Sequence, residues 1–242
     1  MSWTEVLYRY CERGTDPTLF AEPVNVLTSA AFFATAALAW RKLMSLPSAV
    51  RDIDCKIFVA LIAMMGVGST IFHLFGQRWS YFADVTPITI FILVYLNFAL
   101  NRYLAIPPGV SFLATVAYAL TAPAISALPG GGLQLMNGSV GFVPALCVLA
   151  AVAWTAHSRG HPAGRDLLLA TGIFFVALTL RTVDRAVCDL ATIGGHATGT
   201  HGLWHLLNAW VLYLLVTAAM DHGRHGEKTY EVLPPTGRTD EA

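Results

Sequence analysis

The chain has 242 residues, of which 55% are hydrophobic and only 12% are charged. Because an ordinary soluble domain carries about 25% charged residues, this composition, with a mean hydropathy of +0.58, indicates a membrane protein. The formal net charge is zero, which leaves no strongly basic surface for nucleic acid, so we expect no nucleic-acid partner.

Residues 1–23 carry charges of both signs. They lack the basic, apolar and small-residue order of a cleavable signal peptide. We therefore expect residues 1–23 to form a non-cytoplasmic N-terminal segment, and we expect the first apolar run after it to remain as a membrane anchor.

Seven apolar runs follow, each near the roughly 20 residues that an α-helix needs to cross about 30 Å of hydrocarbon. Helix is expected in all of them, because backbone groups in a membrane must find their partners within the segment. The predicted spans are 24–42, 57–75, 82–102, 110–128, 139–157, 167–187 and 202–220. Pro123 interrupts the fourth. The sequence therefore predicts an all-α, seven-transmembrane helix bundle over residues 24–220.

Basic residues are distributed unevenly between the two sides of such a bundle. Ten of the fifteen lie on the side opposite the N-terminus: Arg41, Lys42, Arg51, Lys56, Arg102, Arg159, Arg165, Arg224, Lys228 and Arg238. Since basic loops favour the cytoplasm, we expect the N-terminus outside and the C-terminus inside, although Arg181 and Arg185 near the outer end of the sixth span oppose this. Residues 221–242 would form a cytoplasmic, disordered tail.

Two histidines begin the seventh span, in the stretch THGLWHLLNAW at residues 200–210. Because His201 and His205 are four residues apart, they share one helix face, and one helix can in this way supply two imidazoles to one metal ion. Ionisable residues inside membrane spans usually serve function. The alternative is that both rings lie in the interfacial zone and bond to water or lipid headgroups.

A catalytic zinc site typically takes three protein ligands and leaves the fourth position to water. His73, in the last turns of the second span, is the candidate third ligand. Ser69 precedes it by four residues, and Asp84 lies in the first turn of the third predicted span. All these polar residues fall in the same leaflet of the predicted topology. Buried polar groups are costly unless they are paired, so we expect an intramembrane zinc site.

Each residue also has a simpler explanation when it is taken alone. Ser69 could bond back to a carbonyl of its own helix, or it could form a small-residue packing face with Gly66 and Gly68. Asp84 could complement the dipole of its helix. Both alternatives stay open for the single residues, but they do not explain why the polar groups gather at one depth.

A nucleophilic triad of Ser69, His73 and Asp84 is a further alternative. A serine and a histidine one helical turn apart project nearly in parallel, which is unfavourable for proton transfer between them. Such a triad would also leave His201 and His205 without a role. We therefore favour the metal site over the triad.

The order Ser-x-x-x-His, an aspartate eleven residues after that histidine, and His-x-x-x-His in the last span resembles the alkaline ceramidase family. That family belongs to a wider group of seven-helix membrane hydrolases that includes the adiponectin receptors. The stretch YCERGTDPTLFAEPVNVLTS is similar to the family's acidic N-terminal stretch. The matching positions are Cys11, Glu12, Ala21, Glu22 and Asn25.

This resemblance implies hydrolysis of the ceramide amide to a sphingoid base and a fatty acid, with zinc held by His73, His201 and His205. The chemistry is also reasonable on its own, since bound zinc acidifies water and polarises a carbonyl. Asp84 would act as general base and return the proton to the leaving amine. The Ser69 hydroxyl would hydrogen-bond the developing oxyanion.

The resemblance further implies calcium bound by the N-terminal segment, and here the pattern departs from the family. Glu12 and Glu22 match ligand positions, but Arg9 stands where the family has an aspartate and Gly14 where it has an asparagine. Calcium takes six to eight oxygen ligands, and a neighbouring arginine is unfavourable for it. Asp16 could compensate. Glu12, Glu22 and Asp16 are therefore candidate calcium ligands, against the alternative of a solvated segment.

The sequence thus predicts a membrane-embedded zinc amidase with a ceramide-like lipid as substrate. Two alternatives remain open. One is a related intramembrane hydrolase of another acyl lipid. The other is a seven-helix receptor or transporter that uses its histidines for proton relay or ligand sensing, and such a protein would need no metal.

The four cysteines lack the spacing of a metal motif. Cys11 and Cys188 are predicted on the same non-cytoplasmic side, which is an oxidising compartment. Cys55 is predicted to be cytoplasmic and Cys147 to lie within the membrane, so neither is a suitable partner. We expect a disulfide between Cys11 and Cys188, against the alternative of two free thiols.

Other ionisable residues receive simpler interpretations. Arg181 and Asp184 lie one helical turn apart at the outer end of the sixth span, and they could pair with each other. Four more histidines are expected to face solvent, and we assign them no role: His157, His161, His222 and His225.

Overall fold

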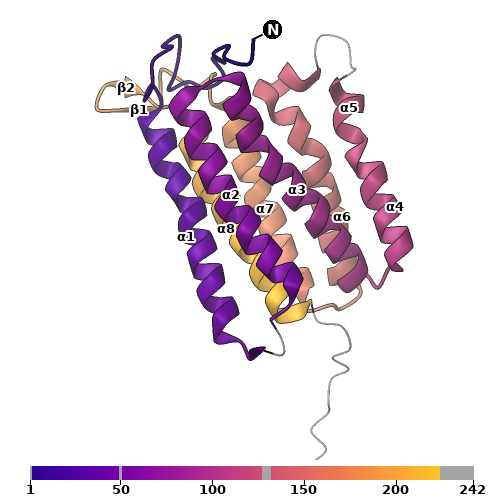
Figure 1. The fold of residues 1–242 in the computed structure, drawn as a ribbon. Coiled ribbons are helices and arrows are strands. Elements are labelled where there is room, and N and C mark those ends of the chain that lie inside the picture. The colour runs from indigo at the N-terminus through magenta and orange to yellow at the C-terminus, as the bar shows by residue number, and fades with distance from the viewer. Residues whose placement is uncertain (1, 49–50, 127–131, 224–242) are drawn as a thin grey trace, which may run out of the picture.

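The computed structural model describes residues 2–48, 51–126 and 132–223. Its helices are α1 (Pro23–Ser45), α2 (Ile53–Phe75), α3 (Arg78–Arg102), α4 (Pro108–Ala119), α5 (Thr121–Ser126), the 3₁₀ helix η2 (Gly132–Phe142), α6 (Val143–Ser158), α7 (Ala163–Val183) and α8 (His201–His222). Two short strands, β1 (Thr192–Ile193) and β2 (His196–Ala197), form an antiparallel hairpin. The all-α prediction is confirmed, and the long helices run side by side as a bundle (Figure 1).

Six helices in the described part of the chain are long and apolar enough to cross a membrane, and α4 is a shorter apolar helix of 12 residues. The predicted fourth span, 110–128, is therefore not one continuous helix. Proline has no N–H group, so Pro123 cannot donate to the carbonyl of Ala119, the residue at which α4 ends. The chain restarts as the six-residue α5.

Helix α8 lies in the middle of the bundle, where it packs against α1, α2 and α7. Within its apolar window, 61% of the residues are buried, the largest share among the candidate spans. Helices α2 and α3 approach each other closely, because a Cβ atom on Gly68 would collide with the carbonyl oxygen of Ala83. Small residues permit such contacts between membrane helices. This contact lies next to Ser69 and Asp84 in the sequence.

The N-terminal segment and the β1–β2 hairpin lie at the same end of the bundle (Figure 1). Leu7 N–H donates to the Gly76 carbonyl at 2.6 Å, which fixes the segment to the end of α2. The predicted disulfide is confirmed, since Cys11 and Cys188 are bonded with their Cα atoms 5.5 Å apart. Cys55 and Cys147 are free. The described N-terminal segment is therefore fastened over one end of the bundle.

The predicted tail, 221–242, lies outside the described residues except for 221–223. Helix α8 reaches to His222, so the seventh span is slightly longer than expected. Near its end, Asp221 forms an exposed ion pair with Lys42 at 2.5 Å. This contact joins the end of α8 to the end of α1.

Candidate metal centre

The three predicted histidine ligands meet near the end of the bundle that the N-terminal segment covers. His73 lies in the last turn of α2, and His201 and His205 lie in the first two turns of α8. Each offers a ring nitrogen that lies within 4.8 Å of the others. All three side chains are buried, with exposures of 0%, 2% and 2%. The fold thus brings His73 next to His201, although the two residues are 128 positions apart in the sequence.

Asp184 determines where α8 begins. Its Oδ1 atom accepts hydrogen bonds from the backbone N–H groups of Thr200 at 2.8 Å and His201 at 2.9 Å. Its Oδ2 atom accepts from the N–H of Cys11 at 2.8 Å. A carboxylate at a helix N-terminus satisfies free N–H groups and complements the helix dipole. Asp184 therefore fixes the turn that carries His201, and it ties this turn to the N-terminal segment.

The suggested pairing of Arg181 with Asp184 is not what the structure contains. Arg181 instead donates to the carbonyl of Asn137 at 3.1 Å, to the hydroxyl of Ser139 at 3.0 Å and to the hydroxyl of Tyr10 at 3.2 Å. Asp184 is occupied by backbone N–H groups. The physical reason is that the first N–H groups of α8 have no partner within their own helix. The Asp184 carboxylate accepts hydrogen bonds from these N–H groups instead of pairing with the Arg181 side chain.

The hydrogen bonds of His73 and His205 determine their tautomers. His73 Nδ1 lies 2.5 Å from Glu22 Oε2, and a carboxylate accepts the proton of that nitrogen. His205 Nδ1 lies 2.9 Å from Thr28 Oγ1, whose own proton is donated to the Val24 carbonyl at 2.9 Å. Both Nδ1 atoms therefore carry the proton. The two Nε2 atoms lie 3.2 Å apart, and when both rings are neutral they face each other with lone pairs.

Two facing lone pairs in a buried site repel each other unless a cation lies beside both. A tetrahedral zinc ion with Zn–N distances of about 2.0 to 2.1 Å places its ligand nitrogens about 3.4 Å apart, which is close to the observed 3.2 Å between His73 and His205. His201 adds a buried Nδ1 that has no hydrogen-bond partner among the described residues. The donor set therefore fits a metal ion of this kind.

Tyr10 covers the His201 ring. The two rings are stacked with centroids 3.6 Å apart and an interplanar angle of 16°. Burial of Tyr10 raises the pKa of its phenol to about 12, so the hydroxyl is neutral at physiological pH. The N-terminal segment thus shields the histidines from water with an uncharged ring.

Ser69 lies within reach of the same nitrogens. Its Oγ atom is 3.5 Å from His205 Nε2 and 2.9 Å from Ser29 Oγ on α1. Ser29 donates its own proton to the Asn25 carbonyl at 2.8 Å, so the Ser69 proton points to Ser29 and a Ser69 lone pair is free to face the centre. Ser69 therefore links α1 and α2 beside the histidines.

Asp84 lines the same small cavity as Ser69, His201 and His205. Helix α3 begins at Arg78 rather than at residue 82, which places Asp84 in the second turn and not in the predicted first turn. Dipole effects fall off within the first turn. This position makes a dipole role for Asp84 less favourable than a role in the cavity.

A family comparison can now be set beside this geometry. The model of the family described as Ceramidase matches residues 8–233. The chain belongs to the ceramidase family. No match was found among curated proteins.

Membership of the ceramidase family supports a ceramidase-type hydrolase that acts on a lipid amide, in a protein with several membrane spans. The matched range includes the three histidines and both ends of the disulfide. The comparison thus agrees with the fold, and it indicates the class of reaction, hydrolysis of a lipid amide.

The candidate calcium ligands of this ceramidase family member have other partners. Glu12 accepts the N–H groups of Val24 at 2.6 Å and Asn25 at 2.9 Å, so it caps α1. Asp16 accepts the N–H of Thr18 at 2.8 Å and is exposed. Glu22 contacts His73 instead. Calcium binding by Glu12, Glu22 and Asp16 stays a prediction, which these contacts do not favour.

Several residues near the centre make contacts with the histidines that sequence reasoning did not assign. Glu22 was considered only as a calcium ligand, yet it bonds the ring of His73. Thr28 and Tyr10 contact the other two histidines. In the sequence, these residues could have been noticed because they are polar and lie at the same predicted depth as the histidines. A buried carboxylate such as that of Glu22 needs a partner. The identity of that partner depends on how α1 and α2 pack.

Proposed function

We propose that this chain hydrolyses the amide bond of ceramide with a zinc ion held by His73, His201 and His205. The observation that carries the proposal is the pair of buried Nε2 atoms of His73 and His205, 3.2 Å apart, with Asp84 and Ser69 beside them. Neutral imidazole nitrogens are common ligands of catalytic zinc. When bound, the ion would supply an acidified water and would polarise the amide carbonyl.

The chain's own residues would perform the proton transfers. Asp84 takes the proton of the attacking water while the water oxygen forms a bond to the amide carbon. The Ser69 hydroxyl turns from Ser29 to the substrate, since its proton can rotate, and it donates to the developing oxyanion. Asp84 then gives its proton to the amide nitrogen as the C–N bond breaks. A sphingoid base and a fatty acid leave.

Glu22 and Thr28 would keep the ligands in position. A carboxylate that accepts the Nδ1 proton of a metal-binding histidine fixes its tautomer and raises the basicity of the other nitrogen. Glu22 does this for His73 at 2.5 Å, and Thr28 holds His205 at 2.9 Å. Both partners come from α1 or from the residue directly before it.

An apolar cavity supports a lipid as the substrate. Its volume is about 90 Å³, and its lining residues come mainly from α3, α6 and α8. Met65, Ile88 and Phe142 border both this cavity and the small one at Asp84. The lining continues along α3 to Ala99, which is about 16 Å beyond Ile88 at 1.5 Å per residue. An acyl or sphingoid chain could occupy this space while its amide lies at the histidines.

We also infer that the end with the proposed site faces the non-cytoplasmic side. The Cys11–Cys188 disulfide lies at that end, and disulfides persist in oxidising compartments. The exposed ends of α1 and α6 opposite to it carry basic side chains such as Lys42 and Arg159, as cytoplasmic ends do. This orientation can be tested with a tag at the N-terminus. Labelling of that tag by a reagent confined to the cytoplasm would contradict the inferred orientation.

The test of the proposal is product analysis. The purified protein is loaded with zinc and incubated with a panel of N-acyl and O-acyl lipids, and the products are identified by mass spectrometry. We expect ceramide to give a sphingoid base and a fatty acid. Cleavage of esters alone would favour the related hydrolase. A protein that binds no metal and turns over no lipid would favour a receptor or transporter with a proton relay.

A further inference from the structure

Arg13 is the largest fully buried side chain in the described part of the protein, with 1% of its surface exposed. Its three guanidinium nitrogens all donate to oxygen atoms. Nε donates to Glu22 Oε1 at 2.6 Å, and Nη2 donates to the His73 carbonyl at 3.0 Å. Nη1 donates to the carbonyls of Thr18 at 3.1 Å and Asp16 at 3.3 Å. A cage of one carboxylate and three carbonyl oxygens thus surrounds the charge.

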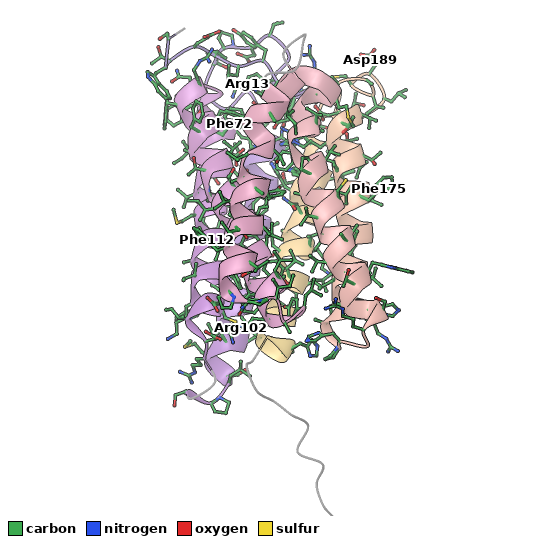
Figure 2. All side chains as sticks on the ribbon, turned by 90° about the vertical axis from the view of Figure 1, so that its right-hand side faces the viewer. Arg13, Phe72, Arg102, Phe112, Phe175 and Asp189 are labelled. Carbon is green, nitrogen blue, oxygen red and sulfur yellow. A yellow bond between two sulfur atoms is a disulfide. The ribbon has the colours of Figure 1, made fainter. Side chains whose placement is uncertain are left out.

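The cage has space for a guanidinium because of Gly76. This residue has a positive φ of 63°, and a Cβ atom there would lie 2.5 Å from Arg13 Cζ. Glycine is the residue that tolerates this conformation and this close approach. The end of α2 is therefore shaped around the Arg13 side chain. Figure 2 shows Arg13 at the same end of the bundle as Phe72, with Arg102 at the opposite end.

Oxygen cages of this kind are also what calcium requires, because calcium takes carboxylate and carbonyl oxygens. The cation that uses the oxygens here is the guanidinium. A calcium ion at Glu22 would lie against a buried positive charge, at a high electrostatic cost in a low-dielectric site. The other two candidate ligands are engaged elsewhere, since Glu12 caps α1 and Asp16 bonds Thr18. The residues present do not fit a calcium ion.

Arg13 also acts on the metal centre through two routes. Glu22 binds Arg13 with Oε1 and His73 with Oε2, so the carboxylate is held between them. The guanidinium reaches the backbone carbonyl of His73 as well. Both the ring and the main chain of His73 are thus fixed by one buried cation. Arginine suits such a position because it stays charged and its nitrogens form a rigid fork.

We propose that the Arg13 guanidinium is a built-in cation that takes the place of calcium and positions Glu22 and His73 without a bound calcium ion. Arg13 is in this sense a positioning residue and does not touch the substrate. The inference about calcium stands on the contacts of Arg13, Glu12 and Asp16. The inference about His73 rests on the proposed metal centre, although not on the identity of the substrate.

The first experiment measures calcium directly. The protein is purified in calcium-depleted buffer, loaded with zinc, and titrated with calcium while binding is followed by calorimetry and the midpoint of thermal unfolding is recorded. We expect no saturable binding and no shift of the midpoint up to millimolar calcium. A saturable calcium site that raises the midpoint would overturn the proposal.

The second experiment tests positioning with cobalt as a spectroscopic probe in place of zinc. Arg13→Ala removes the cation, and Arg13→Lys keeps the charge but loses the fork. Loss of a partner of a ligating histidine typically weakens metal affinity by about 10-fold to 100-fold, and we expect this for Arg13→Ala, with a smaller loss for Arg13→Lys. The absorption bands of bound cobalt report the affinity independently of any substrate.

Arg78→Ala is the matched control. Arg78 pairs with Glu5 of the N-terminal segment at 2.6 Å, and it is partly exposed. We expect this variant to bind cobalt as the unaltered protein does. Wild-type cobalt affinity in both Arg13 variants would refute the positioning role. If Arg13→Ala does not fold, the cobalt affinity of Arg13→Lys alone tests the positioning role. Failure to cleave ceramide would leave all these readouts unaffected, so it is distinguishable from failure of this proposal.

Discussion

Burial separates the three proposed ligands from the other histidines of the described chain. His73, His201 and His205 are almost fully buried. His157 and His196 are exposed. Burying a polar ring in a membrane bundle is costly unless its nitrogens are satisfied. Glu22 and Thr28 satisfy the Nδ1 atoms of His73 and His205, and a bound metal ion would satisfy the remaining ring nitrogens. The interpretation of the pair in the seventh span as interfacial residues is therefore less favourable than the metal interpretation.

Removal of any one ligand should abolish metal binding and turnover together. His73→Ala, His201→Ala and His205→Ala are each expected to lower bound zinc from about one ion per chain towards none, because two remaining ligands do not preserve the site. Metal content measured by mass spectrometry after purification checks this. His157→Ala, at an exposed position, serves as the control. A variant that keeps both zinc and activity would exclude that histidine from the site.

Asp84→Asn should separate metal binding from chemistry. The amide has nearly the same shape as the carboxylate but cannot accept the proton of the attacking water, and general-base catalysis is typically worth about 10² to 10⁴ in rate. We expect zinc content to stay and kcat to fall by about that factor. Thr86→Val, on the exposed face of the same helix, is the control. Unchanged turnover in Asp84→Asn would contradict the assigned role.

At the level of helices, the start of α8 depends on a residue from the preceding helix. Asp184 at the end of α7 binds the first N–H groups of α8, and Gly199 between them has no room for a side chain because Asp184 lies against it. The break between α4 and α5 is likewise local, since it follows from Pro123. The Asp184 contacts and the break near Pro123 each determine where a helix begins or ends. The helix ends in turn determine the positions of side chains that line the cavities.

The depth of the apolar cavity should control which chain lengths are accepted. Val152 on α6 lines this cavity. A Val152→Phe substitution fills part of it, and a change of this size in an apolar pocket is typically worth about 1 to 3 kcal/mol in discrimination. We expect kcat/KM for long-chain ceramides to fall about tenfold or more relative to short-chain ones. Competition between two ceramides in one assay measures the ratio.

Val176→Phe provides the control, because Val176 lies on α7 with about half of its surface exposed, 49%. It adds the same atoms outside the cavity. An equal loss of kcat/KM for short and long chains in Val152→Phe would point to general damage rather than to a filled cavity. Chain-length selectivity that stays the same in both variants would separate this cavity from substrate binding.

For the whole molecule, the disulfide joins segments that are 177 residues apart in the sequence. Closing so long a loop stabilises a protein by up to about 5 kcal/mol on the chain-entropy estimate, and less is expected in a membrane that already restricts the unfolded chain. The disulfide also holds Cys11 where its N–H reaches Asp184. Stability and the position of α8 are thus coupled at this end.

Replacing the disulfide should therefore lower stability and activity together. Cys11→Ser with Cys188→Ser is expected to lower the midpoint of thermal unfolding clearly, whereas Cys147→Ser, at an exposed free cysteine, should not. Non-reducing peptide mapping checks the bond itself. Alkylation of both Cys11 and Cys188 before reduction would show that the purified protein lacks it.

Most of the spans and the candidate histidines were predictable because each depends on short-range sequence. A membrane requires long apolar helices, and a spacing of four places His201 and His205 on one helix face. Ser69 and His73 share this spacing. The common depth of these residues followed from the number of spans. The precise start of α3, and with it the turn that holds Asp84, did not follow, because polar residues at a helix end leave the boundary open.

The sequence alone determined that the chain forms a bundle of membrane helices with a histidine-rich site at one end, since the solvent and the helix period dictate both. Only the tertiary structure decided the partners of the buried charges. His73 is 60 residues from Arg13 and 51 residues from Glu22 in the sequence, and Asp184 had a nearer candidate in Arg181. A buried charge takes whichever partner the packing brings within hydrogen-bond distance, and that choice is made by the fold as a whole.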